Sequence, residues 1–223
     1  MENIKENRDV LLSKIINIHK NSYFKEAGMP KLIAVSKKQE EYKIDDAIKI
    51  GHRFFGENRV QEAILRWEDR IKHYDDIELR LIGPLQTNKV KQALKFFNII
   101  ETIDREKLAK SISDNIDDKI KTKSFYIQVN TGDEVQKAGV LALEANNFIE
   151  FCKNDLSLPI IGLMCIPPEN EEPAMHFSLL RKLALKNNLV ELSMGMSNDF
   201  EEAIKFGATS VRIGSKFFGD RKY

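Results

Sequence analysis

The sequence has very little cysteine and no long apolar run. Its 223 residues include 2 cysteines, Cys152 and Cys165, which lie in apolar surroundings without CxxC spacing. This excludes a disulfide scaffold and predicts buried structural thiols in a reducing compartment. No apolar stretch approaches the roughly 20 residues that span a bilayer, and the N-terminal Met-Glu-Asn-Ile-Lys lacks the apolar core of a secretion signal. We therefore expect a cytoplasmic protein.

The chain also lacks an excess of charge of either sign. With 35 basic and 34 acidic residues the formal net charge is +1, which gives no overall attraction to nucleic acid or to an anionic membrane. The cluster Lys89, Lys91 and Lys95 is typical of a solvated helix face. The 4 histidines show no metal-ligand spacing. No linker, repeat or low-complexity tract interrupts the chain, so residues 1–223 are expected to form a single domain with a full core.

Short aliphatic or β-branched runs alternate along the chain with segments whose apolar residues are spaced by three and four. This alternation predicts a parallel sheet with helical crossovers. Eight strands favour a closed (β/α)8 TIM barrel; a Rossmann-type sheet needs a glycine fingerprint after its first strand, where this chain has Ser36-Lys37-Lys38-Gln39. The predicted strands cover residues 31–36, 53–56, 78–82, 99–103, 124–129, 158–165, 190–194 and 210–213.

The segments between the strands predict helices. One apolar stripe runs from Val60 to Ile71, and another begins at Leu141 and reaches Cys152. Asp104 is the expected N-cap of the helix after the fourth strand. Only residues 215–223 follow the eighth strand, too few for a full covering helix. An extra, amphipathic N-terminal helix is expected to cover that side through Leu11, Ile15 and Ile18.

A lysine, Lys37, follows directly on the first predicted strand. In barrels of this type the active site forms at the C-terminal ends of the strands. A lysine held there can form an imine with a carbonyl compound. Because successive side chains of a strand point to opposite faces, Val35 and Lys37 share one face while Ala34 and Ser36 share the other, which favours Lys37 over the neighbouring Lys38.

Two turns near the end of the chain predict a phosphate site. Barrels often bind phosphate at the loops after strands seven and eight, where backbone N–H groups face the anion. The turns Met194-Gly195-Met196-Ser197, in which Ser197 is expected to open a helix, and Arg212-Ile213-Gly214-Ser215 occupy these positions. A lysine amine opposite a phosphate site suggests pyridoxal 5'-phosphate (PLP) as the ligand. If Arg212 faces the ring nitrogen, that nitrogen stays unprotonated, because a guanidinium does not give up its proton.

Each of these residues, taken alone, has a simpler interpretation. A lysine at a strand end is more often a solvated charge, and Gly214-Ser215 alone could be an ordinary turn. Arg212 could pair with a carboxylate such as Glu57, which is itself expected to be a structural partner and not a general base. The order of these residues along eight strands carries the prediction.

Seven segments resemble the signature blocks of the pyridoxal phosphate homeostasis protein family. They follow the order of the family and span nearly the whole chain. The family is similar to the N-terminal barrel of alanine racemases and bacterial-type ornithine decarboxylases, without their C-terminal β domain. The segments are IAVSK (33–37), FGENRVQE (55–62), LIGPLQTNK (81–89), IQVN (127–130), GLM (162–164), LSMGMSNDF (192–200) and VRIGSKFFG (211–219).

The resemblance implies roles for individual residues. It implies that Lys37 carries PLP as a Schiff base, that Arg212 faces the ring nitrogen, and that no residue is catalytic. Asn58, in the Gly-Glu-Asn triplet, is a further expected cofactor-binding residue. The phosphate would be held by Ser197, Gly214, Ser215 and the backbone N–H of Met196.

The chain departs from the family at two places. Many members have tyrosine at the position of Arg59, and many have a His-Ser pair where this chain has Glu101-Thr102. We expect both departures to alter the rim of the site without touching Lys37 or the phosphate loops, and we assign no role to Arg59 or Thr102.

The resemblance implies a protein of intracellular PLP homeostasis that holds PLP without turnover and has apo PLP enzymes as partners. The alternative is a PLP-dependent racemase, which needs a base on each face of the carbanion. Related racemases take one base, a tyrosine, from a second domain that this sequence lacks, and no tyrosine falls at a predicted strand end. A carrier is therefore favoured, and a monomer is expected. A barrel lyase or aldolase that acts on a sugar phosphate through a lysine imine is a third reading.

Overall fold

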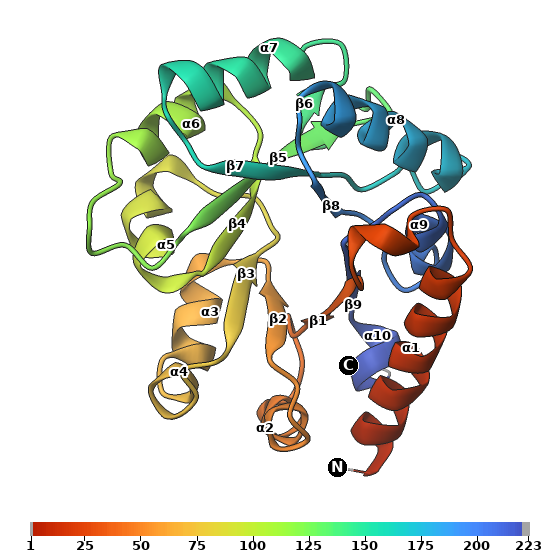
Figure 1. Ribbon diagram of the computed structural model, residues 1–223. Helices are drawn as coiled ribbons and strands as arrows, with labels where there is room; N and C mark the ends of the chain where they lie inside the picture. The colour runs from red at the N-terminus through yellow and green to blue at the C-terminus, as the bar shows by residue number, and fades with distance from the viewer. Residues whose placement is uncertain (1, 220–223) are drawn as a thin grey trace.

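A closed cylinder of parallel strands forms the centre of the protein (Figure 1). The computed structural model describes residues 2–219, without the side chains of Glu2 and Ala27. The strands of the ring are β1 (Lys31–Val35), β2 (Phe54–Glu57), β3 (Glu78–Leu81), β4 (Ile99–Ile103), β5 (Ser124–Asn130), β7 (Ile160–Met164), β8 (Glu191–Ser193) and β9 (Ser210–Ile213). Pairing of β1 with β9 and of β4 with β5 closes the ring. The predicted (β/α)8 barrel is thereby confirmed.

The sequence did not predict one short strand. This strand, β6 (Val140–Leu141), pairs with the end of β5 outside the ring. Leu141 was expected in a helix, and that prediction is wrong. Two contacts hold the segment against β5: Gln128 Nε2 donates to the carbonyl of Ala138 at 3.0 Å, and Gly139, at φ 123°, lies so close that a Cβ there would be 2.6 Å from the nitrogen of Asn130. Only glycine tolerates this approach.

Helices surround the cylinder and cover the outer faces of its strands (Figure 1). Among the residues that the structure describes, no helix is both long and apolar enough to cross a bilayer. Short turns of other helical types lie at Lys25–Ala27, Thr87–Lys89 and Phe151–Asp155. The α-helices are α1 (Glu2–Lys20), α2 (Glu41–Lys49), α3 (Val60–Trp67), α4 (Arg70–His73), α5 (Val90–Phe96), α6 (Glu106–Ser113), α7 (Ala145–Glu150), α8 (Pro173–Lys186), α9 (Phe200–Lys205) and α10 (Ser215–Phe218).

Two details of the predicted helices are wrong. Asp104 is not the N-cap of α6, because its carboxylate pairs with the side chain of Arg105, and Arg105 itself precedes the helix. The predicted helix from Val60 to Ile71 is interrupted after α3. Beyond the interruption, Arg70 turns toward α2 and pairs with Asp45 and Glu41, each at 2.7 Å.

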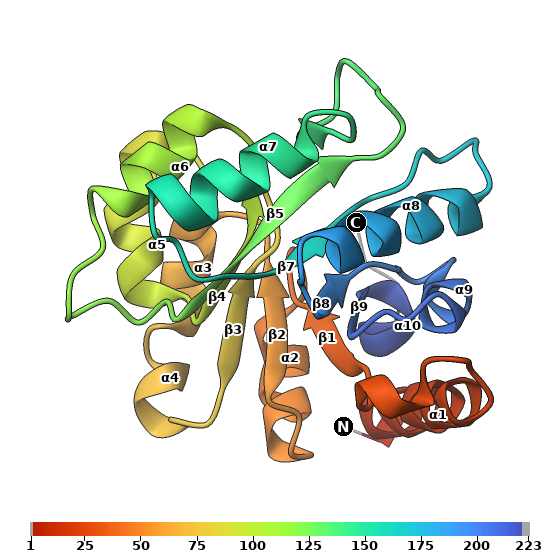
Figure 2. The same ribbon diagram turned by 45° about the horizontal axis from the view of Figure 1, so that its top comes forward.

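The N-terminal helix covers the side where the chain after β9 is short, as the sequence predicts. In both views α1 lies alongside α9 and α10 (Figures 1 and 2). Ile4, Leu11 and Ile15 are buried in this contact face. Asn7 Nδ2 also donates to the carbonyl of Phe217 at 3.1 Å, which ties α1 to α10.

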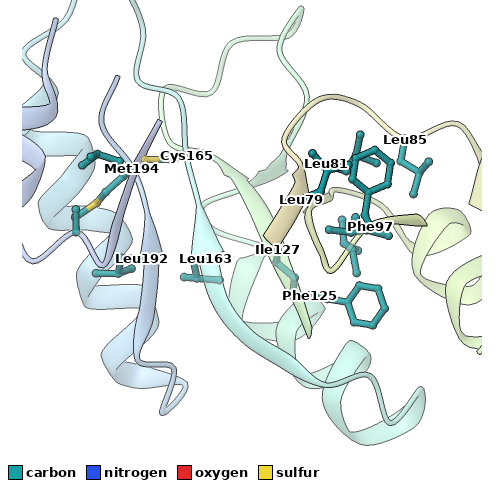
Figure 3. Close-up of a cluster of buried hydrophobic side chains, with 14 of the residues drawn as sticks. Leu79, Leu81, Leu85, Phe97, Phe125, Ile127, Leu163, Cys165, Leu192 and Met194 are labelled. Atoms are coloured by element: carbon teal, nitrogen blue, oxygen red, sulfur yellow. The ribbon is translucent and has the colours of Figure 1, made fainter. Parts of the chain in front are cut away.

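The two faces of the strands carry different kinds of residue. Most outward-facing side chains are apolar and belong to the main core; Figure 3 shows Leu79, Leu81, Ile127, Leu163 and Leu192 among them. Full burial of one such side chain stabilises the fold by about 1.5–3 kcal/mol. The alternate residues of the same strands line the inside of the barrel, and several of them are polar.

The imidazole of His52 is buried just before β2. Its ring lies 5.1 Å from the Phe55 ring and 4.7 Å from the Phe217 ring, between centroids. Its Nε2 lies 2.8 Å from the carbonyl oxygen of Phe54, which can only accept a hydrogen bond. Burial lowers the pKa of His52 from 6.5 to about 4.

His52 should make the fold sensitive to acid. As the pH falls below 6.5 the unfolded chain takes up a proton that the folded protein refuses until about pH 4, so stability is lost across this window. Between pH 7 and pH 5 the expected loss is about 2 kcal/mol. Urea unfolding at both pH values measures this loss. The difference in unfolding free energy between pH 7 and pH 5 should be smaller for His52→Phe than for the unmutated protein. His73→Asn, at an exposed histidine, is the control and should leave the difference unchanged.

Candidate cofactor site

Lys37 lies at the C-terminal mouth of the barrel, two residues beyond β1. Its side chain is half-buried, whereas Lys38 is exposed and has a left-handed backbone with φ 57°. The tip of β1 is close to the loop after β9, since the Cβ of Val35 is 3.7 Å from the point that a Cβ on Gly214 would occupy. Strand alternation places Val35 and Lys37 on the same face. The structure therefore brings the predicted lysine to the same end of the barrel as the predicted phosphate loops.

A buried carboxylate holds the residue that precedes Lys37. Glu57 Oε1 accepts hydrogen bonds from Ser36 Oγ at 2.7 Å, from Arg66 Nη1 at 3.0 Å and from Trp67 Nε1 at 3.0 Å. Arg66 Nη1 also donates to the backbone carbonyl of Ser36 at 3.0 Å. Burial opposes the charge of Arg66, but Glu57 and Glu41 outweigh it and raise its pKa. The backbone next to Lys37 is thus fixed from the outer side of the barrel.

The predicted phosphate loops meet at two hydroxyl groups. Ser215 Oγ and Ser197 Oγ are 3.5 Å apart. The backbone N–H of Arg212 donates to the carbonyl of Gly195 at 2.9 Å, which joins the loop after β8 to β9. A Cβ on Gly214 would make only ordinary contacts, the shortest 3.6 Å to the carbonyl oxygen of Val35, so the glycine leaves space beside the two serines.

The backbone N–H of Met196 already has an acceptor within the chain. It donates to Asp199 Oδ1 at 2.6 Å, so a carboxylate occupies the position expected for a phosphate oxygen. Ser197 was expected to open a helix, and that detail is wrong. The helix α9 begins at Phe200 and Asp199 is its N-cap residue.

Arg212 points into the barrel and is 4% exposed. Its Nη1 donates to Ser193 Oγ at 2.7 Å and its Nη2 donates to the carbonyl of Cys165 at 2.8 Å. It does not pair with Glu57, which binds Arg66, so the simpler interpretation of Arg212 is wrong. Cys165 and Cys152 are both buried free thiols, as predicted, and burial raises the pKa of each to about 12.

The sequence did not predict the buried ion pair between Arg80 and Glu101, which is connected to Arg212 through Ser193. Arg80 Nη1 donates to Glu101 Oε1 at 2.9 Å, and Ser193 Oγ lies 2.6 Å from Glu101 Oε2. Burial opposes the charge of Arg80, but Glu101 and Glu78 outweigh it and raise its pKa. Glu101 is fully buried inside the barrel, so its expected place at the rim is wrong. One sign in the sequence could have shown the pair: Arg80 lies between two leucines of β3, and Glu101 is the single charged residue of β4.

Asn58 follows β2 and is half-buried. Its Oδ1 is buried and has no hydrogen-bond partner among the described residues. Its backbone is packed against Gly83, where a Cβ would lie 2.2 Å from the carbonyl oxygen of Asn58. Thr102 Oγ1 donates to the carbonyl of Gly83 at 2.8 Å. The loops after β2 and β3 and the end of β4 are thus held together, while Arg59 beside them has a largely exposed side chain.

The barrel with a lysine after its first strand defines the class of protein. Residues 18–222 match the family model described as the N-terminal domain of alanine racemase, and the chain belongs to that family. An alanine racemase from Corynebacterium glutamicum shares the fold, with a TM-score of 0.72 and 19% identity over 100% of this chain and 62% of that chain.

Closer relatives define the particular family. A pyridoxal phosphate homeostasis protein of Vibrio alginolyticus is 37% identical over 202 residues, 86% of this chain and 87% of that protein. One from Aquifex aeolicus is 40% identical over 205 residues, 86% of this chain and 88% of that protein. PipY of Synechococcus elongatus PCC7942, solved with PLP bound, aligns with a TM-score of 0.83 and 30% identity over 97% of this chain and all of that chain. The chain belongs to the pyridoxal phosphate homeostasis protein family.

The carboxylate beside Lys37 yields a stability prediction. Glu57→Gln keeps an oxygen acceptor for Ser36 and Trp67 but removes the charge that pairs with Arg66. We expect the free energy of unfolding to fall by about 1–2 kcal/mol, the difference between charged and neutral hydrogen bonds. Urea unfolding measures this change. Glu62→Gln, which removes an exposed ion pair with Arg59, is the matched control and should change stability by less than about 0.5 kcal/mol. Equal effects of the two variants would contradict the role given to Glu57.

Proposed function

We propose that this protein binds PLP and acts in its homeostasis inside the cell, as a carrier with no turnover of its own. One observation carries the proposal: Lys37, after β1, and the serine pair of the loops after β8 and β9 share one mouth of the barrel. An amine opposite a phosphate site suits an aldehyde that bears a phosphate. The relatives named for PLP homeostasis and PipY, which was solved with PLP bound, support the same ligand.

In this proposal Lys37 forms a Schiff base with PLP, since a lysine amine condenses with an aldehyde. PLP supplies that aldehyde. The Ser36–Glu57–Arg66 contacts hold the backbone so that the amine is presented at the mouth. The buried and unpartnered Oδ1 of Asn58 supports a place for Asn58 among the cofactor-binding residues.

We propose that Ser197, Gly214, Ser215 and the N–H of Met196 hold the phosphate. The 3.5 Å between the two serine oxygens and the space beside Gly214 support this assignment. The N–H of Met196 would first have to exchange its acceptor, since it donates to Asp199. If phosphate replaces the Asp199 carboxylate as the acceptor, the net gain in free energy is smaller than that of a new charged hydrogen bond. This small gain suits reversible binding.

The proposal gives Arg212 the position opposite the ring nitrogen. A guanidinium is a donor only and keeps its proton, so it holds a pyridine nitrogen in the unprotonated form. An unprotonated ring withdraws electrons weakly and supports carbanion chemistry poorly. This favours a carrier over an enzyme.

The tyrosines of the described residues also favour a carrier over a racemase. A racemase needs a second base opposite Lys37. Tyr126 is buried inside the barrel, its hydroxyl lies 3.4 Å from Glu191 Oε2, and burial raises its pKa, so it is a poor base. Tyr23, Tyr42 and Tyr74 lie on the exposed surface. Tyr223 lies outside the described residues.

Further parts of the proposal concern the setting of the protein. We propose a cytoplasmic location, which the two free thiols support. We further propose that residues 1–223 act as one PLP-binding domain, that the protein is a monomer, and that apo PLP enzymes are its partners. Size-exclusion chromatography with light scattering measures the assembly state, and a dimer would contradict the proposed monomer.

Replacement of Lys37 by alanine should abolish covalent PLP attachment. The unmutated protein mixed with PLP and reduced with borohydride should gain the mass of one reduced cofactor, and a peptide map should locate it on Lys37. Lys37→Ala should gain none and lose the imine absorbance while its circular dichroism stays unchanged. Lys38→Ala is the matched control and should keep full attachment. Attachment that survives in Lys37→Ala would refute the assignment.

The carrier and racemase functions differ in turnover. With PLP bound, the protein should not interconvert L- and D-amino acids, because none of the tyrosines that the structure describes is suited to act as the second base. Chiral chromatography after incubation with each enantiomer of alanine and of several other amino acids measures this. Turnover of about 1 per second or faster would identify an enzyme instead.

A further inference from the structure

A line of buried polar side chains runs across the inside of the barrel to Arg212. Arg80 of β3 binds Glu101 of β4, Glu101 binds Ser193 of β8, and Ser193 binds Arg212 of β9. All four residues are at most 4% exposed. We call Arg80, Glu101, Ser193 and Arg212 the barrel relay. Its last member is the residue that the proposed function sets against the cofactor ring.

The hydrogen bonds of the barrel relay have a defined direction. Arg212 Nη1 can only donate, so it uses a lone pair of Ser193 Oγ at 2.7 Å. The single hydroxyl proton of Ser193 is then directed at Glu101 Oε2, 2.6 Å away. Arg80 Nη1 donates to the other oxygen, Oε1, at 2.9 Å. Glu101 therefore has to accept at both oxygens, which a carboxylate can do and a glutamine amide cannot.

The charges of the barrel relay do not balance within it. It contains two guanidinium groups, of Arg80 and Arg212, and one carboxylate, that of Glu101, which is fully buried. Arg80 has a second carboxylate in Glu78, at 2.6 Å, which is partly exposed and also pairs with Lys31 at 3.0 Å. Among the described residues no carboxylate pairs directly with Arg212; its two acceptors are Ser193 Oγ and the carbonyl of Cys165. The hydrogen bonds that connect Glu101 with Arg212 pass through the Ser193 hydroxyl.

We propose that Glu101 is a positioning residue of the cofactor site. Through Ser193 it fixes the plane of the Arg212 guanidinium and sets how much positive charge Arg212 presents at the barrel mouth. This inference rests on the proposed function, because it takes PLP as the group that Arg212 faces.

The test compares three single variants with one double variant, which combines Ser193→Ala and Glu101→Gln. Ser193→Ala cuts the barrel relay beside Arg212 and leaves the Arg80–Glu101 ion pair intact. Glu101→Gln breaks one of its two acceptor bonds. Glu78→Gln is the matched control, because it removes a carboxylate from the same Arg80 without touching Ser193 or Arg212. Circular dichroism and urea unfolding establish that each variant is folded before PLP is added.

PLP is titrated into each protein, and both its Kd and the absorption maximum of the bound cofactor are measured from pH 6 to pH 9. Ser193→Ala and Glu101→Gln should each weaken PLP binding by about tenfold and shift the absorption maximum. The Kd of the double variant should be no higher than that of the single variant with the larger effect, because both substitutions interrupt the same line of contacts. Glu78→Gln should keep the Kd and the spectrum of the unmutated protein. A structural role of Glu101 alone would change stability without moving the spectrum.

Two results would overturn the inference. One is a Kd and spectrum in Ser193→Ala and Glu101→Gln equal to those of the unmutated protein. The other is an equal effect of Glu78→Gln, which would show that any lost charge near Arg80 suffices. If the unmutated protein itself takes up no PLP, the proposed function fails first. Urea unfolding without PLP then still measures the coupling between positions 101 and 193, and the absence of coupling would remove the barrel relay itself.

Discussion

A single buried carboxylate, that of Glu101, lies between two buried guanidinium groups and determines how the inside of this barrel is built. Barrels of this type are commonly filled by branched aliphatic side chains. Here polar side chains take part of that space: Arg80 and Ser193 bind Glu101, and Ser193 binds Arg212. Removal of one partner from a buried ion pair typically costs about 3–5 kcal/mol, since the other charge stays in a dry interior. β3, β4, β8 and β9 must therefore keep the separations that these hydrogen bonds require.

The candidate cofactor site is fixed from both sides of the barrel wall. On the inner side, the contacts of Ser193 and Cys165 determine where the Arg212 guanidinium lies. On the outer side, Glu57, Arg66 and Trp67 hold Ser36 and with it the backbone that leads to Lys37. Strand alternation makes this possible, because neighbouring residues of β1 reach opposite sides of the cylinder wall. The half-buried lysine is thus presented by a rigid support while its own side chain remains at the mouth.

The sequence predicted the strands well because each has an apolar outer face with a period of two, and all eight predicted strands are present. Lys37 and the loop residues Ser197 and Ser215 could be predicted because they occupy strand ends. The position of Glu101 could not. The register between β4 and β5 shifts between Ile100 and Ile103, so a period of two does not hold along the whole of β4. Ser193 lies 92 residues from Glu101 in sequence, and only closure of the ring brings them together.

The errors near the site have a common physical origin, namely side chains that satisfy backbone groups locally. Ser197 was expected to open α9, yet Asp199 takes the N-cap position and its carboxylate binds the N–H of Met196. Asp104 was expected to cap α6, yet it pairs with Arg105. A carboxylate in a loop has several N–H and guanidinium partners within a few residues, and propensity alone does not choose among them. At Met196 the outcome matters for function. Under the proposed function, phosphate must compete with an internal anion there, which limits the gain from that contact and leaves the serine hydroxyls and Lys37 to provide most of the hold on the cofactor.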